Sequence, residues 1–340
     1  MRDGGAWGRP PLHSLPGCRR CQIPKTTRLV LYRMADHTSQ NSWPRVGVVI
    51  VNWNLKDTLR ETLASCLQID YPDFKVVVVD NGSTDGAPEM VRKEFPQVHL
   101  IANATGMGYA HATSQGMEWL VQQGARYLFS TSNDVIFDRA ILREMTSYLE
   151  SHPDVGLVGS KVFFHDRPQI IWHAGGHIGW HGHSMHFGWE RRDHPRYDNP
   201  RECVFVTGCG YMVRAELAQK LGYLKSDLVF YSEDSDFCQR IKKAGFRVMY
   251  LPTAKLWHKT STTLAKNRGL QLRYSTRNNL YVLQTHRVGL PYPLTLGIHL
   301  VAVLPIKMLF FLLLGQPANA VGIWRGICDW RHGRYGMINE

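Results

Sequence analysis

Hydrophobic and polar positions in the first half of the chain follow two alternating patterns. Continuous β-branched runs at 46–51 and 75–80 predict strands covered on both faces, and between them the apolar positions of 56–68 recur at helical spacing. Further helices are expected near 87–95, 110–123 and 139–151, and further strands near 98–102, 127–131 and 155–160. This alternation predicts an α/β fold in which a parallel sheet carries helices on both faces.

Polar residues follow three of these predicted strands. Asn52 and Asn54 come after the first strand, Asp80 ends the second, and Asn133 and Asp134 follow the strand near 127–131. In sheets of parallel strands, ligands bind in the crevice outside the carboxyl ends of the strands. These side chains are therefore expected to converge on one crevice.

The second half of the chain is less regular. Residues 163–200 are rich in His, Gly, Trp and Arg, which favours a loop or hairpin over the reaction centre. An apolar stretch at 204–213 is followed by the acidic run at 233–236, which opens a predicted helix ending at Gly245. A strand near 247–251, a helix at 270–284 and a strongly apolar segment at 294–314 complete the prediction.

The net charge of +12 is concentrated at the two ends of the 340-residue chain. Basic residues outnumber acidic ones by six in 1–45 and by eight in 259–340, which leaves the middle at −2. A basic segment beside an apolar one favours an anionic membrane surface over a nucleic-acid groove as partner. Residues 1–45, rich in Pro, Gly and Arg, are predicted to be a disordered basic extension.

The spacing of cysteine and histidine residues indicates which metal sites and disulfides the chain could form. Seven scattered cysteines, an odd number, favour a reduced cytosolic compartment over a disulfide framework. Cys18 and Cys21 have the spacing of half a zinc site, but the sequence holds no second pair of this spacing. The histidines of 163–200 suit contact with an acceptor sugar, with a structural zinc site as the alternative; they include His173, His177, His181, His183 and His186.

The turn after the first strand separates two kinds of nucleotide site. A dinucleotide-binding fold places Gly-x-Gly-x-x-Gly there, but residues 52–57 contain no glycine, so the backbone cannot closely cradle a pyrophosphate. Asp80 can still bind a ribose hydroxyl or a base edge from the end of the second strand. The alternative for Asp80 is a carboxylate that bonds only its own turn.

A metal ion is expected to hold the diphosphate in place of a glycine loop. The Asp134 carboxylate, with phosphate oxygens and waters, suits Mg²⁺ or Mn²⁺. The alternative for Asp134 is an N-cap of the helix that follows. His258 can complete the ligand set as an imidazole, or it can be a structural histidine.

Three acids in the four residues 233–236 exceed what a helix start needs, although acids there also complement the helix dipole. Asp234 is expected to act as a general base on an acceptor hydroxyl, with Glu233 as a helper. Attack on the sugar carbon while the diphosphate leaves would invert the anomeric centre in one step.

Seven segments resemble, in the same order, those of family 2 glycosyltransferases, especially the rhamnosyltransferase-like branch. They are Val49–Asn54, Val78–Gly86, Gly108–Ala110, Ser132–Val135, Phe205–Cys209, Tyr231–Arg240 and Leu251–His258. The resemblance implies a GT-A fold, with a nucleotide-binding half at 46–160 and an acceptor half at 161–258. The chain departs from the family pattern at Gly106, Ser114 and Ser132, so the resemblance does not fix the donor sugar.

The resemblance also implies roles for individual residues. Asp234 would be the catalytic base assisted by Glu233, Asp134 the last acid of a DxD-type metal motif, and His258 a metal or diphosphate ligand. Residues implied to bind the nucleotide sugar are Asn52, Asn54, Asp80, Ser83, Asp85 and Asn133. The implied partners are a nucleotide-diphospho-sugar, such as dTDP-rhamnose, and a glycan or lipid-linked acceptor of cell-surface polysaccharide synthesis.

The apolar segment at 294–314 is long enough to span a bilayer, but His299, Pro305 and Lys307 interrupt it. A membrane-associated helical tail at 259–340 is expected, at the cytoplasmic face of the membrane, with a buried core helix as the alternative. Two other functions remain open from the sequence: a nucleotidyltransferase, and a non-catalytic scaffold that binds sugars or nucleotides.

Overall fold

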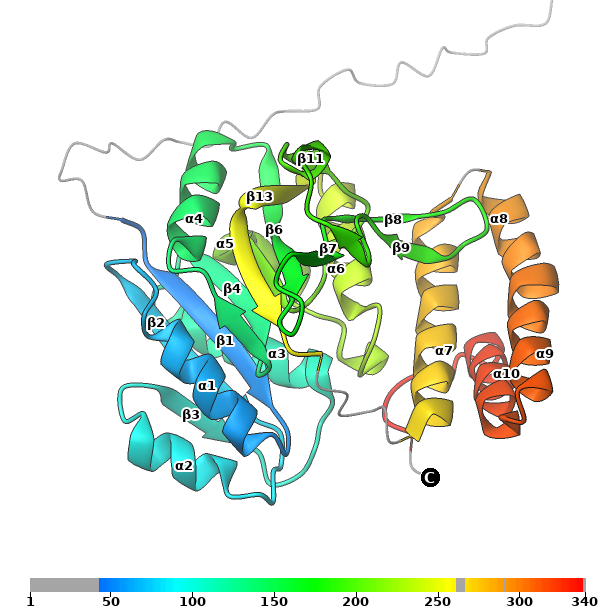
Figure 1. Cartoon of the computed structure of the whole chain (residues 1–340), viewed down its shortest axis with the longest axis horizontal. Helices are drawn as coiled ribbons and strands as arrows, with labels where there is room; N and C mark the ends of the chain where they lie inside the picture. Colours follow the sequence, from blue (N-terminus) through cyan, green and yellow to red (C-terminus); the bar gives the residue numbers. More distant parts are fainter. Residues whose placement is uncertain (1–42, 261–266, 290, 339–340) are drawn as a thin grey trace, which may run out of the picture. The chain divides into compact units, whose positions relative to one another are not determined.

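Four parallel strands form one half of the sheet, in the order β3-β2-β1-β4 (Figure 1). They are β1 (Val46–Asn52), β2 (Phe74–Asp80), β3 (His99–Ala102) and β4 (Tyr127–Ser132). The computed structural model describes residues 43–260, 267–289 and 291–338. Most of the predicted disordered extension, together with Cys18 and Cys21, lies outside the described residues.

The strands predicted within 46–160 run in one direction, but the sheet as a whole is mixed. β12 (Gly210–Arg214) inserts between β4 and β6 (Val155–Phe164) and runs antiparallel to both. The chain returns through β12 after a long excursion, and the periodicity of a single buried strand does not encode its direction. The remaining strands of this mixed sheet are β5 (Val135–Phe137), β7 (Ile170–His173), β10 (Arg191–Arg192), β11 (Arg201–Glu202) and β13 (Arg247–His258).

Helices cover both faces of the sheet, as predicted, because successive side chains of a strand point to opposite faces. Val48 and Ile50 belong to the core under α1 (Lys56–Cys66), α2 (Ala87–Glu94) and α4 (Ile141–Ser151). Val49 and Val51 belong to the core under α3 (Tyr109–Gln122), α5 (Ala215–Leu221) and α6 (Glu233–Lys243). Gly116 lets α3 approach closely, since a Cβ there would lie 2.4 Å from a methyl group of Val49.

The histidine-rich stretch forms the predicted hairpin, built from β8 (Gly176–Ile178) and β9 (Ser184–His186). Short 3₁₀ turns at η1 (Pro195–Tyr197) and η2 (Ser226–Leu228) lie between it and α6. The turn of the hairpin is held by α7 (Arg268–His286), because Asn279 Nδ2 donates to the Gly182 carbonyl at 3.0 Å. The hairpin is thereby fixed at its tip as well as at its base.

One long helical segment follows, made of α8 (Tyr292–Ile298), the wide π turn η4 (His299–Val303) and α9 (Leu304–Leu313). Pro305 has no N–H to donate, and the helix widens just before it, where the Leu304 N–H reaches the His299 carbonyl. Tyr292–Leu313 has a mean hydropathy of 2.2 and is long and apolar enough to cross a membrane, by length and composition alone. α10 (Pro317–Arg331) packs against α7 and α9.

The outer side of this segment exposes large apolar side chains. We call them the apolar face: Val301, Ile306, Leu309, Phe310 and Leu313 of the long segment, with Trp324 of α10. Leu313 is 78% exposed and Leu309 56%. A buried core helix, the alternative left open by the sequence, would not leave these side chains uncovered.

Candidate functional site

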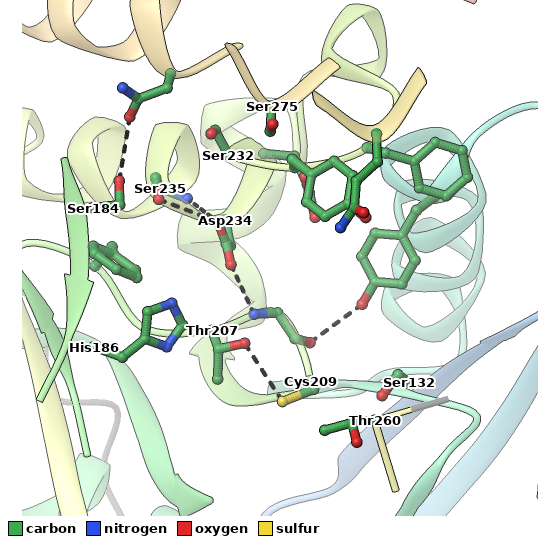
Figure 2. A pocket seen from close by; sticks show the side chains of 18 of the residues that line it. Ser132, Ser184, His186, Thr207, Cys209, Ser232, Asp234, Ser235, Thr260 and Ser275 are labelled. Atoms are coloured by element: carbon green, nitrogen blue, oxygen red, sulfur yellow. Dashed lines mark hydrogen bonds between the residues drawn. The ribbon is translucent and has the colours of Figure 1, made fainter. Parts of the chain in front are cut away.

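A cleft of about 840 Å³ opens at the carboxyl ends of β1 and β4. Its walls come from four parts of the chain: the strand ends, the start of α6, the β8–β9 hairpin, and the C-terminal helices. The residues that carry the argument below are Asn133, Asp134, Glu233, Asp234, His258, His183, Asn279 and Lys307. Figure 2 shows Asp234 near the centre of the side chains drawn around this cleft.

Side chains of the strand ends meet in a chain of hydrogen bonds, as predicted, but of the predicted residues only Asn133 and Asp134 line the cleft. Asn133 Nδ2 donates to Asn52 Oδ1 at 2.5 Å, and Asn52 Nδ2 donates to Asp80 Oδ2 at 2.8 Å. The other Asp80 oxygen accepts from the Ser83 backbone N–H at 2.9 Å. Asp80 is buried and both its oxygens are engaged, so its carboxylate organises the end of β2 and does not itself line the cleft.

Ser83, Asn54 and Asp85 join the loops that follow β1 and β2. Ser83 Oγ accepts from the Asn54 N–H at 2.9 Å, and Asn54 Oδ1 accepts from the Thr84 N–H at 2.8 Å. The Asp85 carboxylate accepts from the first backbone N–H groups of α1 and α2, at Lys56 (2.8 Å) and Ala87 (3.1 Å). These bonds give the loops one fixed arrangement beside the cleft.

Asp134 and His258 meet at the edge of the cleft. β13 pairs antiparallel with β5, which places His258 opposite Val135 and brings His258 Nε2 to 3.1 Å from Asp134 Oδ1. Ser132 Oγ donates to the same carboxylate oxygen at 2.6 Å. This pairing joins two residues 124 positions apart, which the sequence predicted as ligands of one metal ion.

The Asp134–His258 pair fits a divalent cation as a partial ligand set. Carboxylate and imidazole are both ligands of Mn²⁺, and His258 Nδ1 is buried with no hydrogen-bond partner among the described residues. No group of three or more His, Cys, Asp or Glu side chains suited to a metal occurs in the described part of the chain. Such an ion would therefore need further oxygens from a bound diphosphate and water.

Asp234 is held at the start of α6 by the loop between β11 and β12. Its Oδ2 accepts from the Gly208 N–H at 2.9 Å, and its Oδ1 accepts from the Ser235 N–H at 2.6 Å (Figure 2). Burial raises the pKa of Asp234, while the Ser235 and Gly208 hydrogen bonds partly counter the rise. A fixed carboxylate with a raised pKa at a cleft is suited to accept a proton.

The neighbouring Glu233 carboxyl group differs from Asp234 in its hydrogen bonding. Its side chain lines the cleft but is only 7% exposed, and its Oε2 has no hydrogen-bond partner among the described residues. Burial, and then repulsion from Asp234, raise the pKa of Glu233 well above its ordinary range. Burial thus raises the pKa of both adjacent acids, and the hydrogen bonds from Ser235 and Gly208 favour the ionised form of Asp234.

The segment before these acids is strained, a feature that the sequence did not indicate. Val229, Tyr231 and Ser232 all have left-handed φ angles, of 63°, 66° and 64°. Val229 centres a γ-turn closed by a 2.7 Å bond from the Phe230 N–H to the Leu228 carbonyl, a conformation that a β-branched residue rarely adopts. Strain of this kind persists only where the surroundings impose it.

Asn278 of α7 supplies that constraint. Its Nδ2 lies 2.6 Å, 2.7 Å and 2.9 Å from the carbonyl oxygens of Leu228, Phe230 and Tyr231. The neighbouring Arg277 guanidinium also points its Nη2 at the Leu228 carbonyl, at 3.4 Å. An Asn inside a predicted helix gave no signal of this role, because the carbonyls it serves lie nearly 50 residues earlier.

Aromatic rings and His186 line the cleft on the hairpin side. The ring centres of Trp172 and Trp189 lie 5.8 Å apart, and both rings contact the His186 ring. His186 Nδ1 lies 2.8 Å from His173 Nδ1, so His173 supports His186 from the buried side. Rings of this kind present flat apolar faces on which sugars can stack, as the sequence suggested for this stretch.

The chain is similar in sequence to known proteins. The sequence profile of the glycosyltransferase-like family 2 matches residues 44–276. The uncharacterized protein y4gI of Sinorhizobium fredii is 26% identical over 232 residues, 65% of this chain and 25% of that protein. An N-acetylglucosaminyl-diphospho-decaprenol L-rhamnosyltransferase of Mycobacterium tuberculosis is 23% identical over 235 residues, 62% of this chain and 75% of that one. The chain therefore matches only a quarter of the first relative's length.

Solved structures share the fold. The mannosyltransferase PcManGT from Pyrobaculum calidifontis, solved with GDP-Man and Mn²⁺, has a TM-score of 0.54 at 16% identity and covers 86% of this chain and 88% of its own. GalNAc-T7, solved with UDP, GalNAc and Mn²⁺, has a TM-score of 0.55 at 15% identity over 72% and 48% of the two chains. The predicted GT-A fold is thus confirmed. Since the family profile runs from β1 into α7, over more than half of the chain, this protein belongs to the glycosyltransferase-like family 2.

Proposed function

We propose that the chain is an inverting glycosyltransferase that moves a sugar from a nucleotide-diphospho-sugar to an acceptor hydroxyl. The observation that carries the proposal is the state of Asp234. This carboxylate lines the cleft, is fixed by Gly208 and Ser235, and has a raised pKa beside Glu233, whose pKa lies well above its ordinary value. A scaffold that only bound sugar would have no use for a fixed carboxylate with a raised pKa at this position.

In the proposed reaction Asp234 removes the proton of the acceptor hydroxyl as its oxygen attacks the anomeric carbon of the donor sugar. The bond from that carbon to the diphosphate oxygen breaks, and the nucleoside diphosphate leaves with the electron pair. Because the sugar is transferred in a single displacement, the configuration at the anomeric carbon is inverted. Glu233 donates no electrons in this step; as a neutral acid it keeps a second negative charge away from Asp234 and from the departing diphosphate.

The donor occupies the carboxyl ends of β1, β2 and β4 in this proposal. Asn133 faces the cleft, and Asn52, Asp80 and Ser83 fix the loops around it. Asn54 and Asp85 hold the same loops from the outer side. Asp134 and His258 would hold a Mg²⁺ or Mn²⁺ ion, which, when bound, neutralises charge on the diphosphate.

The acceptor is proposed to be a lipid-linked sugar at the cytoplasmic face of a membrane. Two observations support this choice: the exposed apolar face of the C-terminal helices, and the mycobacterial relative, whose name gives a diphospho-decaprenol acceptor. That name also makes dTDP-rhamnose the first donor to test. The basic surplus of residues 259–340 would add attraction to anionic lipid.

A thermal-shift screen of nucleotide sugars with Mn²⁺, followed by a transfer assay, tests the proposal. The Asp234→Asn variant is expected to keep its thermal shift with the donor and to lose transfer, while Asp57→Asn on the surface of α1 keeps both. Asp134→Ala should lose the part of nucleoside-diphosphate affinity that depends on Mn²⁺. Full transfer by Asp234→Asn would remove it as the base, and donor binding without any transfer by the wild type would favour the scaffold.

A nucleotidyltransferase is the second function that the screen can detect. Such an enzyme would release pyrophosphate from a nucleoside triphosphate and a sugar phosphate. Within the described residues, no lysine or arginine lines the cleft at the strand ends, where that chemistry would need to grip a triphosphate. Release of pyrophosphate by the wild type would overturn the glycosyltransferase proposal.

A further inference from the structure

Lys307 is an unexpected residue for its position. It lies in the most apolar helix of the chain, one turn from Leu304 and Phe311, yet its side chain lines the cleft and not the outer surface. The carboxylates that line the cleft are Asp134, Glu233 and Asp234, and in the described part of the chain no carboxylate forms an ion pair with Lys307. A partly buried ammonium group without an acid is costly unless a bound anion compensates it.

Two further nitrogen-bearing side chains accompany Lys307. Arg268, at the start of α7, places its guanidinium 5.6 Å from the centre of the Phe311 ring, on the next turn after Lys307. His183 lines the cleft from the turn of the β8–β9 hairpin. Burial, and after it the neighbouring Lys307 ammonium, lower the pKa of His183 to about 4, so His183 is a neutral imidazole at pH 7.

His299 holds the hairpin turn in place for His183. Its Nδ1 donates to the His181 carbonyl at 2.8 Å, and its Nε2 accepts from Asn279 Nδ2 at 3.3 Å. The His183 and His299 rings lie 6.0 Å apart. The π turn that contains His299 therefore sets the distance between the hairpin and the helix that carries Lys307.

The hairpin strand next to His183 lies on the side of Asp234 away from the strand ends. In the view of Figure 2, Ser132 and Thr260 are drawn on one side of Asp234, and Ser184 and His186 of β9 on the other. Ser184 adjoins His183 and contacts Asn279, the partner of His299, at 3.3 Å. A ligand bound to Lys307 and His183 would thus lie in the same cleft as Asp234.

We infer that Lys307 and His183 form a subsite for the phosphate groups of the acceptor lipid, an inference that rests on the proposed function. An ammonium and an imidazole N–H are donors suited to phosphate oxygens. The same helix turns its apolar face outward, so the lipid chain can leave the subsite along the surface that would meet the membrane. The helix then serves as an anchor on one side and as a recognition element on the other.

Calorimetry with full-length protein in detergent tests the subsite with farnesyl diphosphate as the probe. Lys307→Met is expected to weaken binding of this probe by roughly ten- to a hundred-fold, the loss for one charge-assisted hydrogen bond. Lys307→Arg should restore most of the affinity. Lys220→Met, which removes an exposed cation of α5, should leave it unchanged. Binding of farnesol, which has the same chain without phosphate, should be equal in all four proteins.

Two arms separate the acceptor phosphate from other sources of phosphate. Affinity for dTDP with Mn²⁺ should not change in Lys307→Met; a matching loss there would assign Lys307 to the donor and overturn the inference. Binding to phosphatidylglycerol vesicles should also persist. Loss of vesicle binding with farnesyl diphosphate affinity retained would assign Lys307 to lipid headgroups instead.

Equal farnesyl diphosphate affinity in wild type and Lys307→Met would also overturn the inference. These measurements need no turnover, so they stand apart from the transfer assay that tests the proposed function. If transfer is absent but the probe binds through Lys307, the reaction is wrong and the subsite remains. If transfer depends on Asp234 but not on Lys307, the reaction remains and the subsite is wrong.

Discussion

His286 Nε2 lies 2.8 Å from Asp236 Oδ1, so the end of α7 is bonded to α6 two residues after Asp234. The other Asp236 oxygen accepts from Arg240 Nε at 2.7 Å. Burial disfavours the charge on Asp236, but the His286 hydrogen bond and the Arg240 charge outweigh it and hold the pKa of Asp236 below its ordinary value. The family match ends at residue 276, so the part of α7 beyond the match fixes the helix that carries Asp234.

We expect His286→Ala to lower the free energy of unfolding by about 1–3 kcal/mol, because it leaves a buried carboxylate oxygen without its partner. The turnover number should fall, since α6 loses one of its supports, while affinity for the nucleotide stays near that of the wild type. Urea unfolding and transfer kinetics measure the two effects. His332→Ala, at the exposed end of α10, is the matched control, and equal unfolding curves for both variants would refute the role of His286.

A substitution at Asn278 can displace Asp234 without changing a residue that lines the cleft. Asn278→Leu keeps a similar volume but removes the donor shared by three carbonyls, so the strained segment at 228–232 should relax. We expect faster proteolysis at this segment and a large loss of turnover, with a smaller loss of nucleotide affinity. Asn279→Leu, whose side chain holds the hairpin instead, should leave the segment protected. Unchanged protease cleavage in Asn278→Leu would show that other contacts impose the strain.

Glu233 should make stability depend on pH with a defined sign. The pKa of Glu233 is raised in the folded protein, so its contribution to stability is full below its unfolded pKa of about 4.3 and is lost as pH rises through the folded value. Glu233→Gln removes the ionisation. The variant should therefore melt at a higher temperature than the wild type at pH 8 and at a similar temperature at pH 4. A stabilisation that is the same at both pH values would mean that Glu233 stays neutral or is solvated when charged.

Much of the fold could be predicted from local patterns. The strand and helix near 46–66 fell within two residues of their prediction, because a β-branched run and an apolar helical stripe are decided by neighbouring residues. The convergence of Asn52, Asp80 and Asn133 followed from the rule that ligands bind at parallel strand ends. The direction of β12 did not follow, since an antiparallel return depends on which edge of the sheet is free.

The parts of the site that escaped prediction depend on long-range contacts. Asn278 lies inside the predicted helix at 270–284 and His286 just beyond it, and only the packing of α7 on the segment before α6 and on α6 itself gives them partners. Lys307 looked like an interruption of an apolar segment, whereas the structure turns it toward the cleft. Sequence patterns thus located the acids but not the side chains that hold them or that face them from the C-terminal helices.

The apolar face of the C-terminal helices should control membrane binding. Ile306 and Leu313 are 67% and 78% exposed, so changing both to Asp should cost little folding free energy. Burying one such side chain in lipid contributes about 1.5–3 kcal/mol, so the double variant should bind vesicles roughly a hundred-fold more weakly or worse. Co-sedimentation with phosphatidylglycerol vesicles measures this. Met107→Asp, at an exposed apolar residue before α3, is the control. If the double variant sediments like the wild type, the apolar face is covered by something other than lipid, and a second copy of the chain becomes the occupant to test by light scattering.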